Sequence, residues 1–360
     1  MAERYSFEKA EDEAGQVQEG FRRAGVAHPS SEIYEKASRI ETELDARAEQ
    51  EAKERPERIQ KLMARVDALF PGQGLHSLRE EIRASFDVPQ FGAYHNEGSF
   101  MDTHLDLMRT RIKEMSDGIF DEAVPEDVRT LFARLVREDP EFFEKYVFLH
   151  DIRKKDCLTI TYLDGKKGSG TWQNWKDTIP AEALADPRAL RAYGKSASMR
   201  GISYFQDRGK NGGFVQHGAD AERYLKNFRG LEVSRGMLIA IREHEVAYQF
   251  QNIQPGTYRK HFEHLSSRER DLALAATYID SSSALGKRRP PRADLTGFRA
   301  LVDSKYNFEL LQRIWGALSR RPDVNDVLLE RELMRLEKRK ERIADPPDDL
   351  ISRVAHECRR

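Results

Sequence analysis

The chain contains very little cysteine: only Cys157 and Cys358 occur in its 360 residues. A disulfide framework and a thiolate-bound zinc knuckle both use several cysteines, so the sequence excludes both classes. So few cysteines fit a reducing compartment, and we expect a cytoplasmic protein. At this length the chain can bury a full core without disulfides, as one to three domains.

Long apolar runs are also missing. One of the longest, residues 236–241, is far shorter than the ~20 residues that span a bilayer. Residues 1–4 begin no basic-then-apolar signal. An overall charge bias is missing as well, because 60 Lys and Arg oppose 61 Asp and Glu. The composition therefore predicts no membrane partner, and a polyanion would have to be bound by a local basic patch.

What the sequence does contain is helical periodicity over most of its length. Residues 1–60 carry 10 Lys and Arg against 15 Asp and Glu, so we expect solvated helices there, with a stripe over 31–69 that Pro56 interrupts. The expected core and terminal helices lie at 105–115, 128–136, 141–155, 219–227, 233–245, 266–281, 308–318 and 324–343. Ser266 and Glu269 can cap one of them. We predict an all-α fold with a polar extension at 1–85, a helical domain at 86–290 and a second extension at 291–360.

One segment, residues 156–214, breaks the helical pattern and is expected to form a small, partly β insertion. Residues 158–162 are rich in β-branched side chains and predict a hairpin, and residues 200–213 read as a glycine-rich loop. Residues 153–213 hold 12 Lys and Arg against 6 Asp and Glu, which makes this region the local basic patch. The loop is either a flexible surface segment or a substrate-binding element. In the second case Arg200, Arg208 and Lys210 are the candidates for binding a polyanionic substrate.

Six potential metal ligands lie on or at the ends of the expected helices. They are His104, His150, Asp151, His217, His244 and Asp280. Imidazole and carboxylate groups suit Mn, Fe, Ni, Co or Zn, and one aspartate can bridge two cations through its two oxygens. Two cations about 3.5–4 Å apart lower the pKa of a bound water and neutralise charge on a phosphoryl oxygen. Taken singly each histidine could be a packed core residue, but as a set they favour a two-metal site for phosphoester hydrolysis.

Five short segments carry these residues in a fixed order. They are YHNEGSFMDTHL at 94–105, FLHDIRK at 148–154, QHGADAE at 216–222, IREHE at 241–245 and ATYIDS at 276–281. This order of His, His-Asp, His, His and Asp resembles the HD-domain metal-dependent phosphohydrolase superfamily over roughly residues 90–285. The first two segments look especially like the HD domain of bacterial tRNA nucleotidyltransferases, whose nucleotidyltransferase domain has no counterpart in residues 1–85. The resemblance implies an HD-domain helical bundle.

The resemblance also assigns roles within the set. It makes His104, His150, Asp151 and Asp280 ligands of one divalent cation, with Asp151 bridging to a second cation held by His217 and His244. Lys154 matches the lysine that the family has three residues after the aspartate, where it could hold a substrate phosphate. On a helix the same spacing also gives a simple ion pair with Asp151. Asp151 and Lys154 are therefore the candidate catalytic residues.

Three residues beside these ligands need separate interpretation. Arg153 stands where the family usually has glycine, and would either contact substrate or crowd the site. His95 and Glu97, in a polar turn where Asn96 replaces the commoner proline, are candidate partners that orient His104 or a metal-bound water. A turn of this composition also forms local backbone hydrogen bonds.

These observations predict a metal-dependent phosphohydrolase. Its substrate would be a nucleotide, a cyclic nucleotide or an RNA end, and the attacking water would be activated by two divalent cations. Two other functions fit the same ligands: a di-iron oxygenase of a small polyol or phosphonate, and a non-catalytic HD module that senses a nucleotide or RNA. The expected partners are a phosphorylated small molecule or nucleotide, RNA, and a second copy of the chain bound through the terminal helices.

Overall fold

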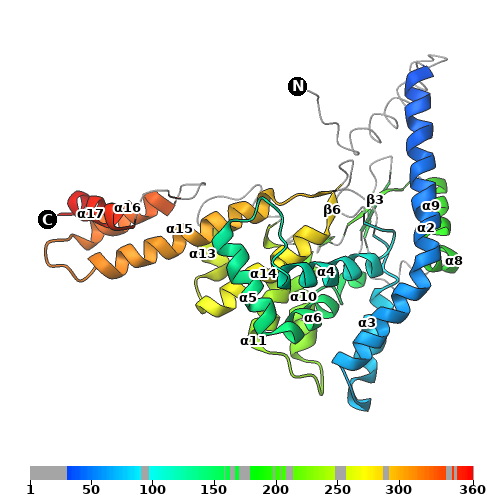
Figure 1. Ribbon diagram of the computed structural model, residues 1–360, viewed down its shortest axis with the longest axis horizontal. Helices are drawn as coiled ribbons and strands as arrows, with labels where there is room; N and C mark the ends of the chain where they lie inside the picture. The colour runs from blue at the N-terminus through cyan, green and yellow to red at the C-terminus, as the bar shows by residue number, and fades with distance from the viewer. Residues whose placement is uncertain are drawn as a thin grey trace.

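The structure is a computed structural model. It describes residues 31–90, 97–157, 159–162, 167–169, 179–197, 199–203, 205–207, 214–247, 257–286, 292–337, 343 and 347–359. Within these residues helices predominate and strands are short, which confirms the predicted all-α class. A helical body lies between a long N-terminal helix on one side and a C-terminal arm of helices that points away on the other (Figure 1). None of the described helices is both long enough and apolar enough to cross a membrane.

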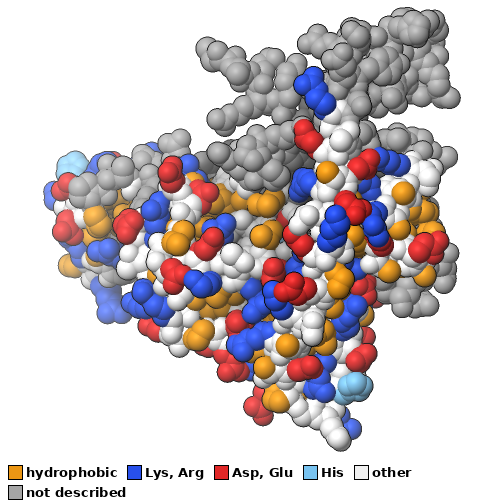
Figure 2. All heavy atoms as spheres, turned by 45° about the vertical axis from the view of Figure 1, so that its right-hand side comes forward, with side chains coloured by type: hydrophobic (Ala, Val, Ile, Leu, Met, Phe, Trp, Pro, Cys, Tyr) orange, Lys and Arg blue, Asp and Glu red, His pale blue; other side chains and the backbone are white. Residues whose placement is uncertain are grey.

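The long helix, α2 (Ser31–Leu69), is continuous through Pro56, so the predicted interruption is wrong. A proline inside a helix costs ~3 kcal/mol or more, because it removes a backbone hydrogen bond and crowds the preceding turn. Tertiary contacts of the preceding residue compensate for this cost: the Arg55 guanidinium donates to Asp102, to Asp87 and to two backbone carbonyls. On the exposed face of α2, acidic and basic side chains are interspersed (Figure 2).

The helical body is built around one central helix, α14 (Ser267–Ser283). The other helices of the body are α3 (His76–Ser85), α4 (Met101–Ser116), α5 (Glu126–Glu138), α6 (Pro140–Leu149), α10 (His217–Lys226), α11 (Arg235–Glu243) and α13 (Thr257–Phe262). Ser266 and Glu269 form the predicted capping box at the start of α14. Every side chain from Leu272 to Ser283 is buried, and α4, α5 and α11 pack around the helix. A polar residue on such a helix needs buried partners.

One hydrophobic core joins parts of the chain that the predicted boundaries separate. Leu62 and Val66 of α2 and Leu78 and Ile82 of α3 belong to the same core as α4 and α14. One side of residues 62–86 is therefore packed against the helical body, while residues such as 71–74 remain exposed. The polar pattern applies to the preceding part of α2, where most of the described side chains are exposed.

In the part of the insertion that the structure describes, there are short strands and two helices. They are β1 (Thr159–Tyr162), β2 (Lys167–Ser169), α8 (Ala181–Ala185), α9 (Pro187–Ser196), β3 (Met199–Ser203), β4 (Phe205–Asp207) and β5 (Phe214–Gln216). The predicted hairpin is confirmed as the antiparallel pair β1–β2, to which β3 adds in the order β2-β1-β3. Residues 200–203 and 205–207 of the predicted glycine-rich loop are strands instead, because they pair with β1 and β5. A further two-stranded pair joins β6 (Leu285–Gly286) to β7 (Arg292–Ala293).

The C-terminal arm has a small core of its own. It consists of α15 (Thr296–Leu318), α16 (Asp326–Glu337) and α17 (Pro347–Glu357). The first half of α15 packs into the main core through Phe298 and Leu301, and its second half packs into the arm through Ile314 and Leu318. This helix is longer than the predicted one at 308–318, and it connects the body to the arm without a break.

Candidate metal centre

The six predicted ligands come together in the interior of the helical body. His104 lies on α4, His150 and Asp151 follow α6, His217 begins α10, His244 follows α11 and Asp280 lies on α14. Each of the six is at most 4% exposed. Their donor atoms form overlapping groups within 4.8 Å that could hold a metal ion. Residues separated by up to 176 positions in the sequence therefore meet in one buried cluster.

One half of the cluster joins α4, α14 and the end of α6. His104 Nε2 lies 3.0 Å from Asp280 Oδ1, and His150 Nε2 lies 3.8 Å from the same oxygen. His150 Nε2 also lies 3.1 Å from Asp151 Oδ2. The Nε2 atoms of His104 and His150 thus converge on Asp280, and His150 also lies next to Asp151.

The other half joins α10 and α11 to the remaining oxygen of Asp151. His217 Nε2 lies 2.9 Å and His244 Nε2 3.5 Å from Asp151 Oδ1. The two Nε2 atoms are 3.0 Å from each other. Asp151 therefore directs one carboxylate oxygen to each half, which is the arrangement that a bridging ligand requires.

All four imidazoles are oriented through their other ring nitrogen. The Nδ1 atoms of His150 and His244 donate to the carbonyls of Val147 (2.9 Å) and Ile241 (2.6 Å). The Nδ1 atoms of His104 and His217 lie beside carboxylates, Glu97 Oε1 (3.1 Å) and Glu245 Oε1 (3.4 Å), at ion-pair distance rather than in well-formed hydrogen bonds. An acceptor at Nδ1 favours the tautomer with the proton on that atom. In its neutral form each imidazole then presents the Nε2 lone pair to the centre of the cluster, as in metal sites with supporting carboxylates and carbonyls.

This orientation creates an electrostatic conflict that a cation would remove. With both Nδ1 atoms protonated, neutral His217 and His244 would point two lone pairs at each other across 3.0 Å. Such a contact needs either a proton or a cation between the rings. His150 Nε2 and Asp151 Oδ1 are also buried without a well-formed hydrogen bond in the described part of the chain. Four imidazoles and two carboxylates match the donors of divalent transition metals.

In the metal-free protein, two imidazoles of the cluster bind a proton more tightly than an ordinary histidine does. Burial acts to lower the pKa of His104, but the carboxylates of Asp280 and Glu97 raise it to about 9. Burial opposes protonation of His244 in the same way, and Asp151 nevertheless raises its pKa to about 9. His150 differs, since burial lowers its pKa below the usual value.

The two aspartates remain ionised despite their burial. Burial acts to raise the pKa of Asp151, yet the positive charges of His150 and Lys154 hold it well below the usual range. The pKa of Asp280 is lowered in the same way, against the effect of burial, by His104 and His244. The two aspartates therefore supply fixed negative charge, which protonated imidazoles balance in the metal-free protein and which cations could balance in their place.

Close helix packing brings His217 next to His244. Gly218 follows His217 on α10, and a Cβ at this glycine would lie 2.8 Å from the Ile241 carbonyl oxygen and 3.0 Å from His244 Cε1. Only a residue without a side chain lets α10 approach α11 so closely.

The remaining predicted site residues have different positions. Lys154 is buried and donates a 2.8 Å hydrogen bond to Asp151 Oδ2. This is the ion pair with Asp151 that the sequence offered as an alternative to a contact with substrate phosphate. Arg153 instead pairs with Asp220 and Asp156, outside the cluster. Glu97 has the expected contact with His104.

For the residues of the insertion that are predicted to bind substrate, the described part of the chain neither supports nor contradicts that role. Arg200 lies in β3, and the course of its side chain is not described. His95, Arg208 and Lys210 lie outside the described residues.

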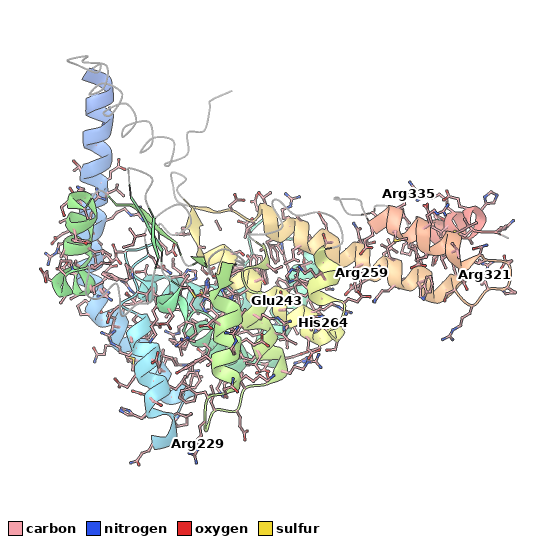
Figure 3. All side chains as sticks on the ribbon, turned by 180° about the vertical axis from the view of Figure 1, so that it is seen from behind. Arg229, Glu243, Arg259, His264, Arg321 and Arg335 are labelled. Carbon is pink, nitrogen blue, oxygen red and sulfur yellow. The ribbon has the colours of Figure 1, made fainter. Side chains whose placement is uncertain are left out.

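Sequence reasoning missed Glu245. It adjoins the predicted ligand His244 in the chain, which is a signal that could have drawn attention to it. Its carboxylate contacts His217 instead, and it belongs to one of the groups that could hold a metal ion. Glu243, labelled in Figure 3, was missed as well. It is buried and accepts a 2.8 Å hydrogen bond from His261 Nδ1.

Comparison of the chain with protein-family models, curated proteins and solved structures finds no match.

Proposed function

We propose that the protein is an HD-type metal-dependent phosphohydrolase with two divalent cations in the six-residue cluster. The observation that carries this proposal is the pair of Nε2 atoms of His217 and His244, 3.0 Å apart with both Nδ1 atoms facing acceptors. The two-sided position of Asp151 supports a binuclear centre rather than a mononuclear one. The ordered segments that resemble the HD superfamily contribute the reaction class.

The residues of the cluster would have different roles in such a centre. His104, His150 and Asp280 would hold one cation, His217 and His244 the other, and Asp151 would bridge them. When bound, two divalent cations supply a water of lowered pKa and positive charge opposite the phosphoryl oxygens. Glu97 and Glu245 keep two of the imidazoles in the tautomer that binds. Lys154 holds one oxygen of Asp151 by its hydrogen bond and so fixes the carboxylate plane.

The proposed substrate is a phosphate ester of a nucleotide, a cyclic nucleotide or an RNA end. The positive balance of residues 153–213 supports a polyanionic ligand. Lys154 would contact a phosphate only by exchanging its bond to Asp151, since it is buried against that carboxylate.

The direct test combines metal analysis with turnover. We expect purified protein to carry two transition-metal ions per chain, and Asp151→Asn to lose at least one of them together with all hydrolysis of a panel of phosphomonoesters and cyclic dinucleotides. Asp106→Asn is the matched control, because Asp106 lies on α4 two residues after His104 and outside the cluster. This variant should keep both metal content and activity.

Three results would overturn the proposal or change its reaction class. Unchanged metal content in Asp151→Asn would reject the binuclear assignment. Two irons with oxygen consumption and no phosphatase activity would identify the oxygenase. Tight nucleotide binding without turnover under any divalent metal would identify the sensing module.

A further inference from the structure

A second site lies at the far end of α10. A cavity of about 820 Å³ opens there between the last turn of α10, the residues that follow it, and the start of α3. Its lining includes Arg153, Asp220, Arg223, Tyr224, Phe228 and Arg229. None of the six clustered ligands lines it. Its volume lies within the range of about 300–1,000 Å³ that is typical of small-molecule sites.

The lining of the cavity has more positive than negative charge. Asp220 is the one carboxylate in the described lining, and its two oxygens are shared by Arg153 and Arg223, each at 3.2 Å. Arg229 also lines the cavity and makes no ion pair with any residue that the structure describes; Figure 3 shows it at the end of the molecule formed by these segments. Asp220, together with Asp156 outside the lining, offsets the charges of Arg153 and Arg223, so the remaining positive charge of the lining is that of Arg229. This excess favours an anionic ligand, and arginine suits phosphate through its paired donors.

The same lining offers flat surfaces. The Arg153 guanidinium lies 4.9 Å from the centre of the Tyr224 ring. Asp156 fixes this guanidinium from another side, with Nη1 to Oδ2 at 2.9 Å. Phe228 packs edge-on against Tyr224, with ring centres 5.6 Å apart. A guanidinium over a tyrosine ring, with a second aromatic ring beside it, provides surfaces on which a planar heterocycle can stack.

The rim of the cavity is open. Gly74 and Gly230 line it, and a Cβ placed at Gly74 would meet nothing within 4 Å. Gly230 has φ +86°, a conformation that other residues rarely adopt. The two glycines lie side by side, since a Cβ at Gly230 would be 3.9 Å from the Gly74 carbonyl oxygen, and backbone without side chains at this part of the rim allows a ligand to approach closely.

We propose that this cavity binds a nucleoside monophosphate, with the phosphate on Arg223 and Arg229 and the base against the layer formed by Arg153 and Tyr224. This inference goes beyond the proposed function, because the site uses none of the proposed metal ligands. The aromatic rings and the excess of positive charge in the lining together distinguish the expected ligand from two simpler ones. A bare phosphate has no ring to stack, and a nucleoside carries no charge.

The test measures binding to the full chain after its metals are stripped. We expect calorimetry at physiological salt to show that 5′-AMP binds at least ~10-fold more tightly than ribose 5-phosphate or adenosine, since each fragment lacks one half of the recognition. Arg223→Ser and Arg229→Ser should each weaken AMP binding about tenfold, as expected for the loss of a charge-assisted hydrogen bond, and leave adenosine binding unchanged. Tyr224→Leu should weaken binding of both AMP and adenosine.

Arg335→Ser is the matched control, since Arg335 is an exposed arginine on α16 in the C-terminal arm (Figure 3). Arg223 and Arg229 are exposed, so replacing them should leave the core intact. The two serine variants therefore still test the proposal if Tyr224→Leu misfolds. The proposal is overturned if AMP binds no better than ribose 5-phosphate, or if Arg335→Ser weakens binding as much as Arg229→Ser. Because the metals are absent throughout, failure of this inference is separate from failure of the proposed hydrolase.

Discussion

At the level of single residues, the candidate centre depends on which group contacts the Nδ1 atom of each imidazole. His150 and His244 donate to carbonyls three residues earlier in their own chain segments, so the helix end itself orients them. His104 and His217 face carboxylates from elsewhere in the chain, namely Glu97 and Glu245. The first pair therefore needs only local structure, whereas the second pair needs tertiary packing.

This difference makes Glu245 a sensitive position. We expect Glu245→Ala to lower the affinity for one of the two proposed metals by about 10–100-fold, because His217 loses the carboxylate beside its Nδ1 atom. Glu245→Gln should recover part of the affinity, since an amide oxygen can accept a hydrogen bond from that atom. Chelator competition with metal analysis measures both effects. Glu57→Gln, an exposed carboxylate on α2, is the control; equal affinities in Glu245→Ala and the unchanged protein would contradict the role.

The meeting of the six residues in one cluster could be predicted from the sequence because their order along the chain carries the information. Each of the six residues has its own helix context, and the resemblance to the HD superfamily joins them into one set. Glu245 could not be assigned to His217 in this way. Its neighbour in the sequence is His244, and its contact with His217 arises only from the packing of α10 against α11.

At the level of helices, the distance between α10 and α11 is set at Gly218. We expect Gly218→Ala to destabilise the protein by about 1–3 kcal/mol, because its methyl group would press on the Ile241 carbonyl and force a backbone shift. The same carbonyl orients His244, so metal affinity should fall as well. Urea unfolding and metal analysis measure the two effects.

A matched glycine tests whether the effect is specific to this contact. Gly316 lies inside α15, and a Cβ there would meet nothing within 4 Å. Gly316→Ala should leave metal binding unchanged and stabilise the protein by about 0.5–1 kcal/mol, the usual gain in helix propensity. If both alanine variants behaved alike, the close approach at Gly218 would not matter for the centre.

The contact between α2 and α4 depends on a buried charge. Asp102 is fully buried and accepts from Arg55 at 2.9 Å and from Arg58 at 2.7 Å, two residues before His104. We expect Asp102→Asn to cost about 3–5 kcal/mol in the free energy of unfolding, because it leaves two guanidiniums without their common counter-charge. Chemical denaturation measures the loss, and Asp106→Asn on the same helix is the control. A loss of less than about 1 kcal/mol would mean that solvent replaces the carboxylate.

These buried pairs also explain the error at Pro56. Local propensity predicts a break at a proline, but it contains no information on Arg55, whose partners lie 31 to 130 residues away. The strands within 200–207 were missed for a similar reason, since they form by pairing with β1 and β5. Where helices follow apolar periodicity, as in α5 and α14, their existence and approximate position could be predicted.

At the level of the whole molecule, the cluster links the fold to pH. In the metal-free protein the pKa values of His104 and His244 rise from the usual 6.5 to about 9. A raised pKa means that the folded state binds these protons more tightly than the unfolded chain does. Their stabilising contribution is therefore complete below pH 6.5 and is lost as the pH rises to about 9. The lowered pKa values of Asp151 and Asp280 affect stability at acidic pH instead. The stabilising contribution of these two carboxylates is lost only as the pH falls below the usual pKa of 3.8.

We therefore expect the melting temperature of the metal-stripped protein to fall between pH 6.5 and pH 9, while that of the metal-loaded protein changes less. Cations replace the two protons when they bind, so loading should release protons at pH 7–8, and metal affinity should rise with pH. Calorimetry in buffers of different ionisation enthalpy measures the release, and thermal melts with and without metal measure the stability. The loaded protein is the internal control for every other group that titrates in this range. Equal melting temperatures of the stripped protein at both pH values would mean that the histidines hold no protons, and the lone pairs of His217 and His244 would then require another explanation.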